Sequence, residues 1–197
     1  MIQVYYFYEV ARLLGIDRLQ KTAFRFGLGD YVFQDFFEEA KGLVPSTSWK
    51  REALGKSWYL GETMISGIGQ GYIKTTNVQL CKMIAHFANG GYQINASFFD
   101  SSDQALGEKI IDDDEHIELI LKSLFEATNL PGGTSYRSRI PGTMKIAGKT
   151  GTAQVRKISE SQREQDLKNK DLPWKFRDHS LFTGYGPADN PKYAISV

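Results

Sequence analysis

The chain has 197 residues, of which 41% are hydrophobic and 13% aromatic, so it is not a disordered tail but a globular protein. Its 24 lysine and arginine residues almost balance its 23 aspartate and glutamate residues, which leaves a net charge of only +1. Nucleic-acid-binding domains usually carry a clear basic excess, and we therefore expect no nucleic-acid partner. The single cysteine, Cys81, can form neither an internal disulfide nor a thiolate metal site alone, and we expect no metal and no cofactor.

A first helix is predicted over residues 4–14, which are mostly apolar and aromatic. It ends at Gly15, a residue that readily takes the left-handed conformation found after helices. The aromatic run at residues 5–8 is expected to pack in the core. The segment includes Glu9 and Arg12, and no run of about 18 apolar residues occurs elsewhere, so we expect no membrane-spanning segment in these residues.

The next segment is predicted to hold a second helix and then irregular structure. Asp17 can cap a helix that runs to Phe26 and is stopped by the glycines of residues 27–29. Residues 30–71 contain Pro45 and six glycines, which are typical of turns and short elements. We expect this stretch to be a surface excursion from the core.

Two further helices are predicted in the middle of the chain. Thr75 and Thr76 can cap a helix that runs to Ala88, with a buried stripe formed by Val78, Met83, Ile84 and Phe87. The acidic residues 112–115 are favoured at the start of another helix by the helix dipole. The predicted buried face of that helix consists of Ile117, Ile120, Leu121, Leu124 and Phe125.

The C-terminal third changes from helical to strand patterns. Strands are predicted over residues 144–155, 180–186 and 193–197. The polar segment at residues 156–178 is expected to be an exposed loop. The last strand pattern stops at the end of the chain, which we interpret as a truncated element.

Helices followed by antiparallel strands indicate the α+β class, with helices packed on an antiparallel sheet. We expect residues 1–197 to be the C-terminal portion of a single, incomplete domain. Its helical part would cover about residues 4–130 and its sheet part about residues 140–197.

The sharpest chemical signal is the triplet Lys149-Thr150-Gly151 on the first predicted strand. The ammonium supplies positive potential, the hydroxyl can hydrogen-bond a substrate carboxylate, and the glycine lets a substrate backbone lie against the strand edge. The simpler interpretation is a strand whose glycine admits a close neighbour. The same triplet accompanies Ser-x-x-Lys and Ser-x-Asn motifs in penicillin-binding proteins and class A β-lactamases.

Residues 147–154 resemble the third motif of class B penicillin-binding proteins. The resemblance runs from about residue 6 to residue 197 with consistent spacing, which makes it far more specific than the triplet alone. Further matching segments lie at residues 15–17, 26–27, 45–50, 61–63, 67–72, 79–80, 88–91, 177–179 and 182–187. Within the family, the surroundings of residues 58–59 and 69–72 look most like the elongation type.

The resemblance implies the family's fold and its serine acyltransferase activity. A serine attacks the D-Ala-D-Ala end of a peptidoglycan stem peptide, the last alanine leaves, and the acyl group passes to an amine. β-Lactams would acylate the same serine. Lys149 would lie opposite this nucleophile, and the N–H of Thr152 would be an oxyanion-hole donor. The implied catalytic residues are Lys149, Thr150, Gly151 and Thr152, and the implied substrate-binding residues are Lys149, Thr150, Thr152 and Gln154.

Two of the family's three motifs are missing from the sequence. No serine is followed by a lysine three residues later, and the match Thr47-x-x-Lys50 falls in a stretch expected to be structural. The second motif would fall at residues 2–4, where no side chain can share a proton with a lysine. Residues 101–103 have the letters of that motif but are expected to form a solvated turn. We expect the nucleophile to precede residue 1, and this polypeptide alone to form no penicilloyl adduct.

Three interpretations remain open. The first is part of a D,D-transpeptidase of cell-wall elongation, on the periplasmic side of the inner membrane with its anchor outside this chain. Its partners would be peptidoglycan stem peptides, β-lactams and wall-elongation membrane proteins. The second is a serine β-lactamase or D,D-carboxypeptidase relative, although the loop at 156–178 argues against a compact β-lactamase. The third is a catalytically inactive remnant or binding module of the wall-elongation machinery.

Overall fold

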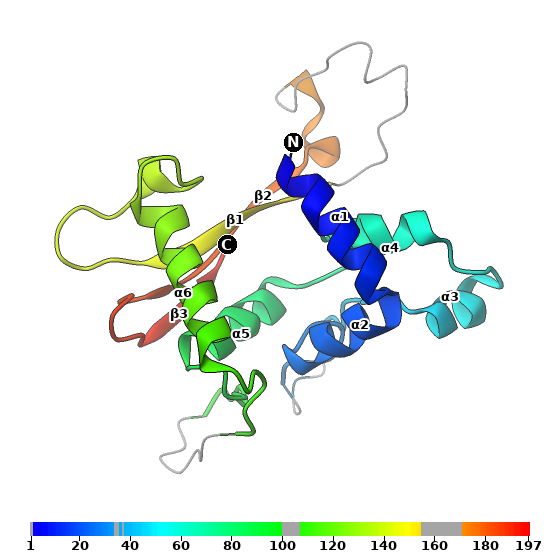
Figure 1. Cartoon of the computed structure of the whole chain (residues 1–197), viewed down its shortest axis with the longest axis horizontal. Helices are drawn as coiled ribbons and strands as arrows, with labels where there is room; N and C mark the ends of the chain where they lie inside the picture. The colour runs from blue at the N-terminus through cyan, green and yellow to red at the C-terminus, as the bar shows by residue number, and fades with distance from the viewer. Residues whose placement is uncertain (1, 34–35, 37, 100–106, 155–170) are drawn as a thin grey trace.

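The residues that the computed structural model describes form six α-helices and a three-stranded antiparallel sheet (Figure 1). The residues described are 2–33, 36, 38–99, 107–154 and 171–197. The helices are α1 Ile2–Leu14, α2 Ile16–Arg25, α3 Thr47–Leu54, α4 Leu60–Ser66, α5 Asn77–Ala88 and α6 Asp114–Asn129. The strands are β1 Ala147–Ala153, β2 His179–Gly186 and β3 Tyr193–Ser196, and the short 3-10 helices are η1 Tyr136–Ser138 and η3 Trp174–Phe176. This order confirms the predicted α+β class.

The elements form two groups in space. Helices α1 to α4 gather on one side in Figure 1, and α5 and α6 pack against the sheet on the other. The strand order is β1-β2-β3, and both strand pairs are antiparallel. The buried residues that join the sheet to α5 are Ile84, Ala147 and Tyr185, and the side chains packed around them include Phe87, Leu121, Leu124 and Phe125. The predicted buried face of α6 is thus confirmed at Ile117, Leu121, Leu124 and Phe125, and β1 rests on a packed core.

The predicted starts of α5 and α6 are confirmed. The Thr76 hydroxyl accepts a hydrogen bond from the N–H of Gln79, and the Gln79 side-chain oxygen accepts one from the N–H of Thr76, both at 3.2 Å. The Asp113 carboxylate accepts from the N–H of Glu115 at 2.9 Å at the start of α6. Local sequence therefore fixes where these helices begin.

The buried stripe predicted for α5 is wrong at Val78, which is exposed. Gln79 occupies the buried position instead and is fully enclosed. Its amide donates to the carbonyls of Asp30 and Lys41 at 2.6 and 2.7 Å, so that a polar side chain ties the loop before α3 to α5. A buried polar side chain is tolerated where its hydrogen bonds are satisfied, which hydrophobic periodicity does not reveal.

The prediction that Asp17 caps the second helix is wrong. Only Gly15, with a φ of 79°, separates α1 from α2, and it serves as the N-cap. Asp17 therefore lies inside the first turn of α2. Its carboxylate instead accepts hydrogen bonds from the N–H and the hydroxyl of Thr47, each at 2.9 Å, and so joins α2 to α3.

The prediction that the aromatic run of α1 packs in the core is also wrong. Tyr5, Tyr6 and Phe7 are 69%, 66% and 51% exposed. Consecutive helical residues point in different directions, and α1 packs against α4 through the small residue Ala11, opposite Gly67. The neighbouring large side chains are therefore left at the surface. Among the described residues, no helix has both the length and the apolar character needed to cross a bilayer.

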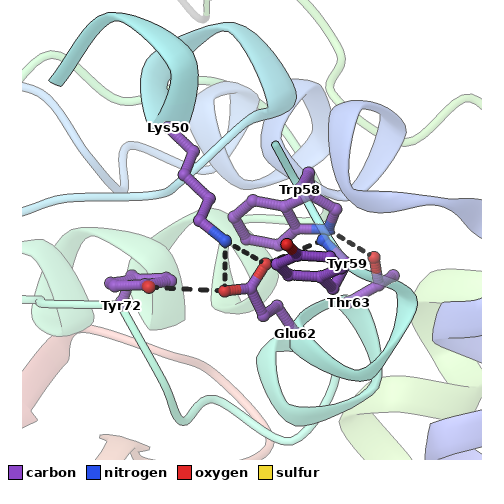
Figure 2. A network of polar contacts seen from close by, with 6 residues as sticks. All are labelled: Lys50, Trp58, Tyr59, Glu62, Thr63 and Tyr72. Atoms are coloured by element: carbon purple, nitrogen blue, oxygen red, sulfur yellow. Dashed lines mark hydrogen bonds and ion pairs between the residues drawn. The ribbon is translucent and has the colours of Figure 1, made fainter. Parts of the chain in front are cut away.

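The stretch at residues 30–71 holds α3, α4 and a buried ion pair, so the expectation of a surface excursion is wrong for this part (Figure 2). Lys50 is 2% exposed, and its Nζ donates to the two carboxylate oxygens of Glu62 at 2.5 and 2.7 Å. Burial raises the pKa of the Glu62 carboxyl, but the hydrogen bonds it accepts from Lys50 and a backbone N–H outweigh this, and its pKa lies below the ordinary value. Three aromatic rings have their centroids within 5.9 Å of the ammonium: Trp58, Tyr59 and Tyr72.

Candidate functional site

β1, which carries the Lys149-Thr150-Gly151 triplet, is an edge strand of the sheet. Among the described residues it pairs with β2 alone. Phe182 on β2 exchanges both of its backbone hydrogen bonds with Val197, each at 2.9 Å. In an antiparallel sheet, a residue that bonds one neighbouring strand in this way directs its N–H and C=O away from the strand on its other side. The N–H and C=O of Thr150, which lies opposite Phe182, therefore face away from β2.

The same alternation holds along the rest of β1. The Thr128 hydroxyl donates to the carbonyl of Gly148 at 3.3 Å, and the Asn129 amide donates to the carbonyl of Ile146 at 2.8 Å. The end of α6 thus occupies this edge of β1 at its beginning. Farther along, the N–H of Thr152 points toward an edge that no described strand occupies. An unpaired edge of this kind can accept a peptide as an added strand.

The predicted site residues surround this open edge. The Lys149 side chain is exposed, and its Nζ donates to the carbonyl of Thr150 at 2.9 Å and lies 3.4 Å from the Thr150 hydroxyl. Because that carbonyl faces the open edge, the ammonium is held beside the edge as well. Thr152 and Gln154 are exposed farther along the chain. A positive charge, a hydroxyl and a free N–H thus lie together, and their roles in substrate binding and catalysis stay predictions.

One neighbour of the site was not singled out from the sequence. The Thr150 hydroxyl donates to the hydroxyl of Thr134 at 3.0 Å. Thr134 belongs to the segment between α6 and η1, 16 residues before its partner. The glycine pair at residues 132–133 is typical of a turn, but nothing local indicates that the turn ends against β1.

The other serine or threonine matches do not form a second candidate site. The Thr47 hydroxyl is bonded to Asp17, and Lys50 is turned toward Glu62, so the Thr-x-x-Lys match is structural. Residues 101–103 lie outside the described residues, as do residues 156–170 of the predicted loop. The described residues also contain no group of three or more histidine, cysteine, aspartate or glutamate side chains that could hold a metal ion.

The penicillin binding protein transpeptidase domain family matches residues 3–197, and the chain belongs to this family. Its curated relatives include peptidoglycan D,D-transpeptidase MrdA of Salmonella typhimurium, 32% identical over 203 residues, and that of Acinetobacter baumannii, 33% identical over 204 residues. Both alignments cover 98% of this chain but only 32% and 29% of the relatives. The chain therefore spans about a third of the length of these proteins.

Solved structures show the same relationship. The chain is similar to Pseudomonas aeruginosa PBP2 in a complex with WCK 5153, with a TM-score of 0.79 and 36% identity over 98% of this chain and 41% of that one. It is also similar to PBP2 of Helicobacter pylori in a complex with MreC, with a TM-score of 0.82 and 29% identity over 98% of this chain and 33% of that one. The expected resemblance to the elongation-type penicillin-binding proteins is confirmed.

Proposed function

We propose that this chain forms the substrate-holding part of a peptidoglycan D,D-transpeptidase, which in the complete protein performs serine acyl transfer on D-Ala-D-Ala stem peptides. The observation that carries the proposal is the open edge of β1, with the Lys149 ammonium and the N–H of Thr152 beside it. Membership of the transpeptidase family supports the same reaction class.

The roles follow from the chemistry of the edge. The stem peptide adds to β1 as a further strand, so that its backbone is aligned before any bond is broken. The N–H of Thr152 donates to the scissile carbonyl oxygen, which becomes negative when a serine attacks it. The hydroxyl of Thr152 and the ammonium of Lys149 donate to the terminal carboxylate, and the Thr150 hydroxyl also binds it when its proton turns from Thr134 toward the substrate. The exposed Gln154 contacts the peptide farther along.

The edge itself can be tested by NMR with the 15N-labelled chain and the peptide diacetyl-L-Lys-D-Ala-D-Ala. We expect the amide signals of Gly151 and Thr152 to shift on addition of this peptide, and not with the matching L-Ala-L-Ala peptide. The substitution Lys149→Met should weaken binding about tenfold, because a charge-assisted hydrogen bond to the carboxylate is lost. Lys192→Met, which removes an exposed lysine from the turn after β2, is the matched control.

The proposal also predicts that the isolated 197-residue chain forms no covalent adduct with penicillin. Acylation needs an activated nucleophile, and none of its serines is followed by a lysine three residues later. Incubation with a fluorescent penicillin, followed by a denaturing gel, should give no band for this chain. The complete PBP2 of Pseudomonas aeruginosa provides the positive control. A fluorescent band for the isolated chain would contradict the proposal and would require another nucleophile.

Location and partners belong to the same proposal. We expect the complete protein to act on the periplasmic side of the inner membrane, together with membrane proteins of wall elongation, and to bind β-lactams. The solved complex of the Helicobacter pylori relative with MreC supports a partner of that kind.

A further inference from the structure

A cavity of about 410 Å³ lies beside β1, between the end of α6, η1 and the sheet. Six of its lining residues carry hydroxyl groups: Thr128, Thr134, Ser135, Ser138, Thr150 and Ser180. The other lining residues are apolar and include Ile146 and Phe182, and none of the lining residues is acidic. The cavity therefore offers hydrogen-bond donors and an apolar wall, and no side chain that lines it carries a negative charge.

Two observations indicate that these hydroxyls can bind a ligand. Lys149 Nζ can only donate, and it lies 3.4 Å from the hydroxyl oxygen of Thr150, whose own proton is donated to Thr134. The Thr134 hydroxyl therefore accepts from Thr150 and can still donate its own proton to a ligand. Ser135 is only 7% exposed, and its hydroxyl has no hydrogen-bond partner among the described residues. A buried hydroxyl without a hydrogen-bond partner lowers the stability of the fold unless a ligand or a water molecule bonds to it.

The cavity adjoins the open edge at the end where a bound peptide would finish. α6 occupies the edge at Gly148, and Thr150 is the next residue whose polar groups face outward. A strand bound along Thr152 toward Thr150 therefore runs into the hydroxyls of Thr134 and Ser138. A carboxylate on a short apolar group matches this combination of donors and apolar wall, and the end of a D-Ala-D-Ala peptide is such a group.

We propose that Thr134, Ser135 and Ser138 form a second wall of the carboxylate site, opposite Thr150, and receive the terminal carboxylate of the stem peptide. Ile146 and Phe182 pack against the methyl group of the last alanine. Thr134 then acts as a specificity-determining residue that selects peptides with a free C-terminus. This inference rests on the proposed function of the β1 edge and adds the residues that recognise the end of the substrate.

The test compares diacetyl-L-Lys-D-Ala-D-Ala, which has a free C-terminal carboxylate, with the same peptide carrying a C-terminal amide. We expect both peptides to shift the amide signals of Gly151 and Thr152 in NMR spectra of the 15N-labelled chain. Only the free acid should shift those of Ser135 and Ser138. Thr134→Val should weaken binding of the acid about tenfold, the usual effect of losing a hydrogen bond to a charged group, and leave binding of the amide unchanged.

Two further variants separate recognition from structure. Thr134→Ser retains the hydroxyl and should restore binding of the acid, while Thr143→Val, at an exposed position before β1, should have no effect. If acid and amide shift Ser135 and Ser138 equally, or if Thr134→Val binds the acid as tightly as the unmodified chain, the second wall is refuted and the β1 edge stands. If neither peptide shifts Gly151 and Thr152, the proposed function fails and this inference fails with it.

Discussion

Glu62→Gln is expected to lower the free energy of unfolding by about 3–5 kcal/mol, the usual cost of leaving one charge of a buried pair without its partner. The Lys50 ammonium is enclosed, and both hydrogen bonds from its Nζ to a side chain end on Glu62. Glutamine keeps the shape of the side chain and removes only its charge. The aromatic rings around Lys50 remain, but cation–π attraction alone contributes less than an ion pair of this kind. Urea denaturation followed by circular dichroism measures the change.

A matched control comes from the surface of α6. Lys122 and Glu126 form an ion pair at 4.0 Å, with side chains that are 73% and 45% exposed. Glu126→Gln should change stability by less than about 1 kcal/mol, because solvent screens exposed pairs. The double variant Lys50→Met with Glu62→Leu should recover much of the stability lost by Glu62→Gln. Equal losses for Glu62→Gln and Glu126→Gln would show that the buried pair does not anchor α3 to α4.

Gly148→Ala is the second substitution with a large expected effect, a loss of about 1–3 kcal/mol from overpacking. A Cβ at this position would lie 2.5 Å from the carbonyl oxygen of Thr183 and 2.6 Å from the ring of Phe182. The carbonyl belongs to the backbone of β2, so the two strands would have to separate. Thermal or urea unfolding gives the change in stability, and binding of the D-Ala-D-Ala peptide should weaken as β1 shifts.

Gly151→Ala on the same strand serves as the control for stability. Its added Cβ would meet its nearest neighbour, the Cβ of Leu181, at 3.6 Å, which is an ordinary contact. We expect its unfolding free energy to stay within about 0.5 kcal/mol of the unmodified chain. A loss for Gly151→Ala as large as that for Gly148→Ala would show that the close approach of β1 to β2 at Gly148 does not cause the effect.

The sequence predicted best those features that local chemistry determines. The caps at Thr76 and Asp113 are recognisable because a side chain bonds a backbone group two or three residues away. The strand that carries the Lys149 triplet is also predicted correctly. The absence of a local signal explains why Asp17 was wrongly expected to be a cap, since its partner Thr47 lies 30 residues away.

The features that the sequence did not predict depend on long-range packing. The Lys50 and Glu62 pair joins two helices, and neither residue follows an apolar pattern that would mark it as buried. Likewise, Thr134 meets Thr150 only because α6 runs back along the edge of β1. The aromatic residues of α1 err in the opposite direction, because they are apolar but exposed. An apolar composition predicts burial but does not identify the neighbouring element that would cover the side chains.

Amide hydrogen exchange along β1 tests the open edge most directly. We predict slow exchange at Lys149 and Gly151, whose N–H groups bond to β2, and fast exchange at Thr150 and Thr152, whose N–H groups face the edge. Addition of diacetyl-L-Lys-D-Ala-D-Ala should slow exchange at Thr152. Exchange at Thr150 and Thr152 that is already as slow as at their neighbours without peptide would show that the edge is covered, and would contradict the proposed substrate site.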